Sequence, residues 1–69
     1  MSIGERITQL RKERNLSQGD LAKAMDVSRQ AVSKWENGTS DPSTSNLLSL
    51  AKLYGIDAAD LLRQVNPEA

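Results

Sequence analysis

Two helix start signals lie a short distance apart in the middle of the chain. Ser17 is followed three residues later by Asp20, which is the pattern of a capping box at a helix N-terminus. Ser28 gives a second start, and the pair Asn37-Gly38 gives a left-handed helix stop. Two short helices joined by a turn of roughly three or four residues predict a helix-turn-helix.

The second of these helices, predicted over residues 28–37, has a polar face almost free of acids. At about 100° per residue, its polar side comprises Arg29, Gln30, Ser33, Lys34 and Asn37, with Glu36 at the edge and Ala31, Val32 and Trp35 opposite. Arginine and lysine pair with guanine and glutamine pairs with adenine in the major groove. The sequence therefore predicts four base-contacting side chains: Arg29, Gln30, Ser33 and Lys34. An ordinary solvated helix face is the alternative, because these residue types also favour helices.

Three motifs extend across this region: Ser17-Gln18-x-x-Leu21-Ala22, then Val27-Ser28-x-x-x-Val32-Ser33-x-Trp35-Glu36-Asn37-Gly38, and finally Pro42-Ser43. Together they resemble the Cro/CI-type helix-turn-helix family, also called the Xre family, over residues 3–64. The resemblance implies an all-α, lambda-repressor-like bundle of about five short helices that binds duplex DNA, usually as a dimer on a palindromic operator. Asp26 departs from the glycine that the family often has in the turn, but aspartate tolerates a positive φ.

Two places beside the predicted base-reading face are suited to phosphate. Gln18 occupies the first turn of its helix, where free N–H groups and the helix dipole attract anions. The resemblance also implies that Gln18 braces the second helix, and simple capping of its own helix is the alternative. We further expect phosphate contacts from Ser28 and from the backbone N–H groups of Asn37, Gly38 and Thr39.

Two roles are open to the basic residues of the first predicted helix. The resemblance implies that Arg11 pairs with Glu36, which would leave no acid facing DNA; a phosphate contact by Arg11 is the alternative. Arg6, Lys12 and Arg14 would then be the freer cations, or ordinary solvated side chains.

The formal net charge of zero argues at first against a nucleic-acid partner. The distribution of charge favours one, because seven basic and four acidic residues precede residue 35, whereas two basic and five acidic residues follow it. The basic half contains the helix-turn-helix, so this half can meet phosphate while the acidic half faces away.

Capping signals and apolar spacing predict three further helices. One covers residues 3–14 and begins with a Ser2–Glu5 capping box, one runs from Ser43 to Gly55, and one begins at Asp57, with Asp60 in the box position, and continues through Val65. In the first, Gly4 is expected only to weaken the first turn.

A domain of this size buries only roughly 600–1,000 Å² on DNA, too little for strong discrimination, so we expect a homodimer. The predicted dimer interface comprises Ile56, Ala58, Leu62 and Val65, with Leu61 in the core; the alternative places both leucines in the core.

Composition excludes several other classes of protein. The chain has no cysteine and no histidine, its acids are scattered, and no glycine-rich phosphate loop is present, so we expect neither an enzyme nor a cofactor or metal site, and no small-molecule substrate is evident. No apolar run of about 18 residues occurs, so we expect no membrane segment.

The expected organisation is one DNA-binding domain over residues 1–66 and a frayed tail over 67–69, in a cytoplasmic, nucleoid-associated protein. The predicted function is sequence-specific DNA binding by a transcriptional regulator, with repression favoured over activation. The alternative is an antitoxin that binds a toxin as well as its own operator.

Overall fold

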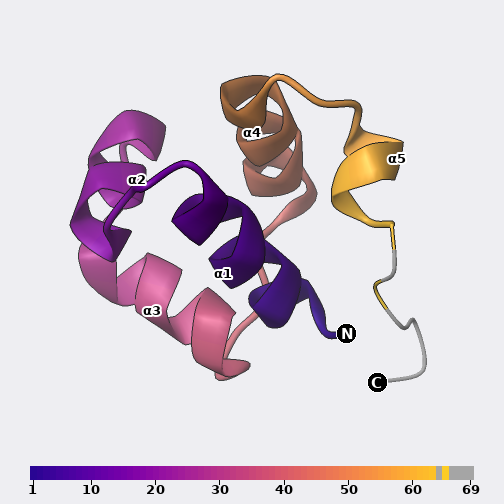
Figure 1. Ribbon diagram of the computed structural model, residues 1–69. Helices are drawn as coiled ribbons and strands as arrows, with labels where there is room; N and C mark the ends of the chain where they lie inside the picture. The colour runs from indigo at the N-terminus through magenta and orange to yellow at the C-terminus, as the bar shows by residue number, and fades with distance from the viewer. Residues whose placement is uncertain (64, 66–69) are drawn as a thin grey trace.

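The computed structural model describes residues 1–63 and 65, and this part of the chain contains helices and no strand (Figure 1). The helices are α1 (Ile3–Glu13), α2 (Gln18–Met25), α3 (Arg29–Asn37), α4 (Thr44–Tyr54) and α5 (Ala58–Leu61). The predicted all-α bundle is thus confirmed, with α2 and α3 as its helix-turn-helix. The expected frayed tail, residues 67–69, lies outside the described residues. None of the described helices is long and apolar enough to cross a membrane.

The capping boxes predicted at Ser2 and Ser17 are both present. In α1, the Glu5 N–H donates to Ser2 Oγ at 3.1 Å, and the Ser2 N–H donates to the Glu5 carboxylate at 2.9 Å. In α2, the Asp20 N–H donates to Ser17 Oγ at 2.9 Å, and the Ser17 N–H donates to the Asp20 carboxylate at 3.0 Å. Each box gives an acceptor to two backbone N–H groups that have no partner inside the helix.

The predicted last helix begins where expected, but it lacks its capping box and ends early. Asp57 occupies the N-cap of α5, but its side chain makes no capping hydrogen bond. The helix ends at Leu61 instead of continuing to Val65. Its last carbonyl groups are taken by Arg6 of α1, which donates to Asp60 O at 2.9 Å and to Leu61 O at 3.2 Å. The Arg63 N–H donates to the same Asp60 carbonyl at 3.2 Å, so the end of α5 is closed by its own backbone and tied to α1 through Arg6.

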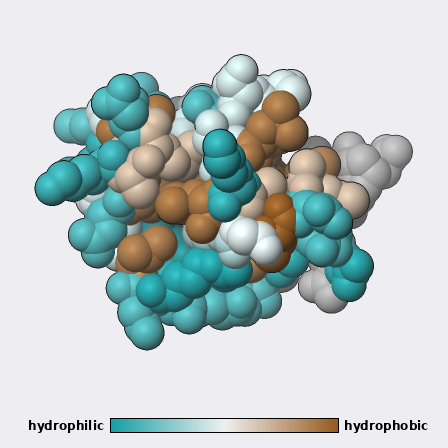
Figure 2. Space-filling model, turned by 90° about the horizontal axis from the view of Figure 1, so that it is seen from above, coloured by the Kyte–Doolittle hydropathy of each residue, from teal (hydrophilic) through white to brown (hydrophobic). Residues whose placement is uncertain are grey.

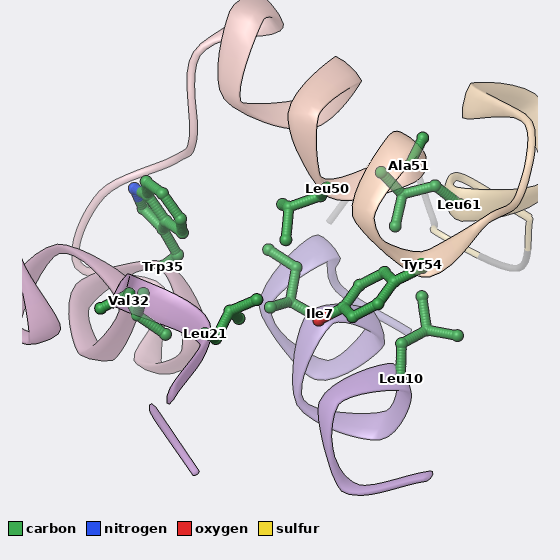
Figure 3. Close-up of a cluster of buried hydrophobic side chains, with 10 residues drawn as sticks. Ile7, Leu10, Leu21, Val32, Trp35, Leu50, Ala51, Tyr54 and Leu61 are labelled. Atoms are coloured by element: carbon green, nitrogen blue, oxygen red, sulfur yellow. The ribbon is translucent and has the colours of Figure 1, made fainter. Parts of the chain in front are cut away.

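Buried apolar side chains from all five helices meet in one core between α1, α3 and α4 (Figure 3). They are Ile7 and Leu10 of α1, Leu21 and Ala22 of α2, Val32 and Trp35 of α3, Leu50, Ala51 and Tyr54 of α4, and Leu61 of α5. Trp35 is only 5% exposed, so it is a core residue, as its helical position predicts, and is not placed to insert between bases. Because Val32 and Trp35 are held in this core, the opposite side of α3 faces solvent.

Candidate nucleic-acid interface

The turn between α2 and α3 depends on Asp26. This residue adopts a left-handed backbone conformation, with φ 58° and ψ 45°, and its N–H donates to carbonyls of the last turn of α2. Aspartate is one of the few residues other than glycine that adopt this conformation readily. Ser28 then begins α3, because its hydroxyl oxygen accepts the N–H of Ala31 at 3.1 Å. The departure from glycine at this position therefore leaves the turn intact.

Helix α3 turns its polar side chains outward and its apolar side chains into the core. Val32 and Trp35 are buried, while Arg29, Gln30 and Lys34 are exposed. Ser33 is partly buried between these exposed groups. The structure thus brings the four predicted base-contacting residues to one outer face of α3.

Glu36, the one acid of α3, forms an ion pair with Arg11. Arg11 Nε donates to Glu36 Oε2 at 2.7 Å and Arg11 Nη2 donates to Oε1 at 3.0 Å, which is the expected ion pair in bidentate form. The two side chains are only 12% and 7% exposed. Burial by itself would raise the pKa of Glu36, but the hydrogen bonds from Arg11 and Gln18 outweigh it and hold the pKa below the ordinary 4.5. The carboxylate is therefore charged at neutral pH but does not face solvent as a free anion.

Gln18 connects the two helices of the motif. Its side-chain N–H donates to Glu36 Oε1 at 3.1 Å, so the carboxamide braces α3 from the first turn of α2. The same turn presents backbone N–H groups that have no acceptor within the helix. Gln18 remains partly exposed in this position.

The turn after α3 differs from the expectation that its backbone N–H groups are free for phosphate. Gly38 takes a left-handed conformation, with φ 83°, and its N–H donates to Lys34 O. The Thr39 N–H donates to the same carbonyl at 2.9 Å and to Asn37 Oδ1 at 2.9 Å. These hydrogen bonds close the helix stop, so the N–H groups of Gly38 and Thr39 are already engaged. A phosphate at this turn would have to be held by the exposed side chains of Asn37 and Thr39.

Two of the three cations expected to be free are committed to the fold. Arg6 holds the end of α5, as described above. Arg14 donates to Tyr54 O at 2.9 Å, and its guanidinium carbon lies 4.6 Å from the centre of the Tyr54 ring. Only Lys12 remains exposed among the three. Residue type and spacing did not distinguish these arginines from Lys12, because their partners are backbone carbonyls of helices distant in sequence.

The profile of a helix-turn-helix family matches residues 7–61, which include all of the interface just described. The chain belongs to the Cro/CI-type helix-turn-helix family. Among curated helix-turn-helix relatives, the transcriptional regulator DicA of Escherichia coli (strain K12) is 45% identical over 53 residues. Antitoxin PezA of Streptococcus pneumoniae is 32% identical over 68 residues. These alignments cover 77% and 94% of this chain, but only 39% and 43% of the respective relatives. The chain thus spans less than half the length of either helix-turn-helix relative.

Solved helix-turn-helix domains share the arrangement of this chain. The DNA-binding domain of the C2 repressor of Salmonella phage P22, determined in solution, has a TM-score of 0.85 and 36% identity, covering 93% of this chain and 84% of that chain. The same repressor in complex with a synthetic operator has a TM-score of 0.82 and 36% identity, covering 91% of this chain and 96% of that chain. The fold of this helix-turn-helix chain is therefore that of a repressor DNA-binding domain.

Proposed function

We propose that this chain binds duplex DNA sequence-specifically through α3 and acts as a transcriptional repressor. The observation that carries the proposal is the outer face of α3, where Arg29, Gln30 and Lys34 are exposed while the helix's single acid is paired with Arg11. Guanidinium, carboxamide and ammonium groups on one helix are suited to base edges in the major groove. The operator complex of the similar P22 repressor supports the same use of this fold.

Phosphate contacts would hold α3 in the groove without reading sequence. We assign them to Gln18 and the first turn of α2 on one side, and to Ser28, Asn37 and Thr39 on the other. Ser28 Oγ accepts a hydrogen bond from Ala31, which leaves its own hydroxyl hydrogen available to a phosphate oxygen. Gly38 contributes by closing the helix stop.

Selection of bound sequences from a random DNA pool tests the proposal directly. A preferred site should emerge, and Gln30→Ala should cost about 1 to 3 kcal/mol on it and relax the preference at one base pair. Gln18→Ala should instead weaken binding to preferred and unrelated DNA together. A pool without enrichment, or a Gln30→Ala variant that binds all sequences less well by the same factor, would contradict base reading by α3.

We further propose that the functional unit is a homodimer on a palindromic operator. Of the residues expected at the interface, Ile56 and Ala58 pack partly against the core, whereas Leu62 is 45% exposed. Leu62 is therefore the main candidate contact, with Val65, whose N–H donates to Leu62 O at 3.1 Å, as a second one. Seen from above, apolar patches interrupt the hydrophilic surface of the molecule (Figure 2).

A role as an antitoxin is the second candidate, and the similarity to PezA supports it. Such a protein would bind a toxin as well as its own operator. A toxin-like gene that neighbours and is co-directional with this one would favour the antitoxin, and a divergent gene or a prophage cluster would favour a repressor alone. In either role the chain would work in the cytoplasm, at the nucleoid, where its DNA is.

A further inference from the structure

Gly4 lies at the closest approach between α1 and α3. The residue is buried, and Figure 1 shows the first turn of α1 beside the end of α3. A Cβ atom added to Gly4 would overlap the carbonyl oxygen of Trp35 and would lie 2.7 Å from that of Glu36. Both obstacles are backbone atoms inside a helix, so they cannot rotate away as the end of a side chain would. The two helices would have to move apart.

The contact joins helix ends of opposite polarity. The first turn of α1 carries the positive end of its helix dipole, and the carbonyl groups of Trp35 and Glu36 lie at the negative end of α3. A residue without a side chain lets these ends touch. The sequence alone suggested only that Gly4 weakens α1, because the cost of glycine inside a helix is local whereas its benefit depends on a second helix.

Side chains hold the same part of α3 as well. Glu36 accepts hydrogen bonds from Arg11 of α1 and Gln18 of α2. The backbone contact at Gly4 and these hydrogen bonds therefore fix one turn of α3. Because a helix is stiff, a displacement here would shift or tilt the exposed side chains of Lys34 and Arg29 as well.

We propose that Gly4 is a positioning residue for base recognition: by admitting close contact with the Trp35 and Glu36 carbonyls, it sets the depth and tilt at which α3 meets the groove. The inference rests on the proposed function of α3. Bidentate base contacts need accurate placement, whereas the phosphate contacts assigned to the first turn of α2 lie on a helix that Gly4 does not contact. Displacement of α3 should consequently reduce discrimination between sequences more than it reduces general DNA affinity.

Gly4→Ala tests this, with Gly55→Ala as the matched control. Gly55 is exposed, has φ 70°, and an added Cβ would meet no atom within 4 Å, so its substitution strains the backbone without contacting α3. Affinities of both variants and of the unchanged chain are measured on the preferred site and on unrelated DNA at one salt concentration. All samples contain an osmolyte that favours the folded state. Circular dichroism gives the folded fraction of each.

Gly4→Ala should lower the ratio of specific to non-specific affinity about tenfold, as expected for one weakened base contact. Gly55→Ala should leave that ratio unchanged. Amide chemical shifts of residues 33–38 should move in Gly4→Ala and remain in place in Gly55→Ala. An unchanged ratio in folded Gly4→Ala, or unmoved α3 amides, would overturn the inference. Absence of any sequence preference in the unchanged chain would instead contradict the proposed function.

Discussion

The carboxylate of Glu36 lies at the edge of the proposed DNA-facing surface, where a free negative charge would repel phosphate. It accepts hydrogen bonds from Arg11 and Gln18 and is nearly buried. An ion pair this well enclosed is costly to break, because removal of the cation leaves a buried charge without a partner. Arg11 thus stabilises the bundle and also prevents Glu36 from repelling DNA at the proposed reading face.

Arg11→Met should lower the free energy of unfolding by about 3 kcal/mol, since it strands the Glu36 carboxylate. Urea denaturation at neutral pH measures the loss. Lys12→Met is the matched control on the exposed side of α1 and should change stability by less than about 0.5 kcal/mol. Equal losses in the two variants would show that the ion pair contributes little.

The same pair predicts a pH dependence. Because folding lowers the pKa of Glu36 below 4.5, its contribution is fully present above that pH and is lost as the pH falls through the lower, folded pKa. Denaturation midpoints of the unchanged chain should therefore fall steeply in acid. The Arg11→Met variant, whose carboxylate gains less from ionisation, should show a shallower fall. A parallel acid dependence in both chains would contradict this assignment.

Tyr54 is buried in the core, and its hydroxyl has no hydrogen-bond partner among the described residues. Desolvation raises its pKa to about 12. It is the one tyrosine of the chain, so tyrosinate absorbance should report half-ionisation near pH 12 when the chain is folded and near pH 10 in urea. Folding favours the neutral form of Tyr54, whereas the unfolded chain ionises above about pH 10. The free energy of unfolding should therefore fall as the pH rises from about 10 toward 12.

Tyr54→Phe should raise the free energy of unfolding by about 1 kcal/mol at neutral pH, because it removes the cost of a buried, unpaired hydroxyl. Thermal and urea denaturation measure the gain. The variant should also lose the decline in stability above pH 10. A less stable phenylalanine variant would mean that the hydroxyl has a partner, such as a bridging water.

At the scale of elements, the angle between α2 and α3 depends on one left-handed residue. Asp26 holds φ 58°, which alanine adopts only at a cost of about 1 to 2 kcal/mol. Asp26→Ala should therefore unfold about 5 °C below Asp26→Gly in a thermal scan. Asp26→Gly should match or exceed the unchanged chain. Similar midpoints for alanine and glycine would indicate that the turn relaxes to another conformation.

Helix α1 contacts the rest of the fold through one pair that the family resemblance implied, Arg11 with Glu36, and through groups that no sequence pattern revealed. Arg6 and Arg14 hold the C-terminal ends of α5 and α4, while Gly4 and Arg11 hold α3. Helix α1 therefore determines how α3, α4 and α5 are placed relative to one another.

At the scale of the whole molecule, assembly on DNA is predicted to depend on Leu62. This side chain is 45% exposed, so Leu62→Glu should leave the circular dichroism spectrum and unfolding midpoint nearly unchanged. It should remove cooperative binding to a two-half-site operator. Leu53, 41% exposed on α4, supplies the control, and Leu53→Glu should bind cooperatively. Light scattering across concentration follows the dimer in both; an intact dimer in Leu62→Glu would place the interface elsewhere.

The local signals of this sequence determined its helices. Ser2, Ser17, Ser28 and Ser43 each mark a helix start, and Gly38 and Gly55 mark helix stops, because capping hydrogen bonds and left-handed conformations involve residues only a few positions apart. The split of α3 into polar and apolar faces followed from helical periodicity. These features need no knowledge of the rest of the chain.

Only the tertiary structure decided the contacts that join distant segments. Arg6 and Arg14 resemble solvated cations in sequence, yet they bind carbonyls 40 or more residues away. The early end of α5, the engaged N–H groups after α3 and the tight contact at Gly4 likewise depend on which atoms meet in space. Capping and periodicity are local in the chain, whereas hydrogen bonding to a distant carbonyl and the space beside a glycine are fixed only when the helices pack.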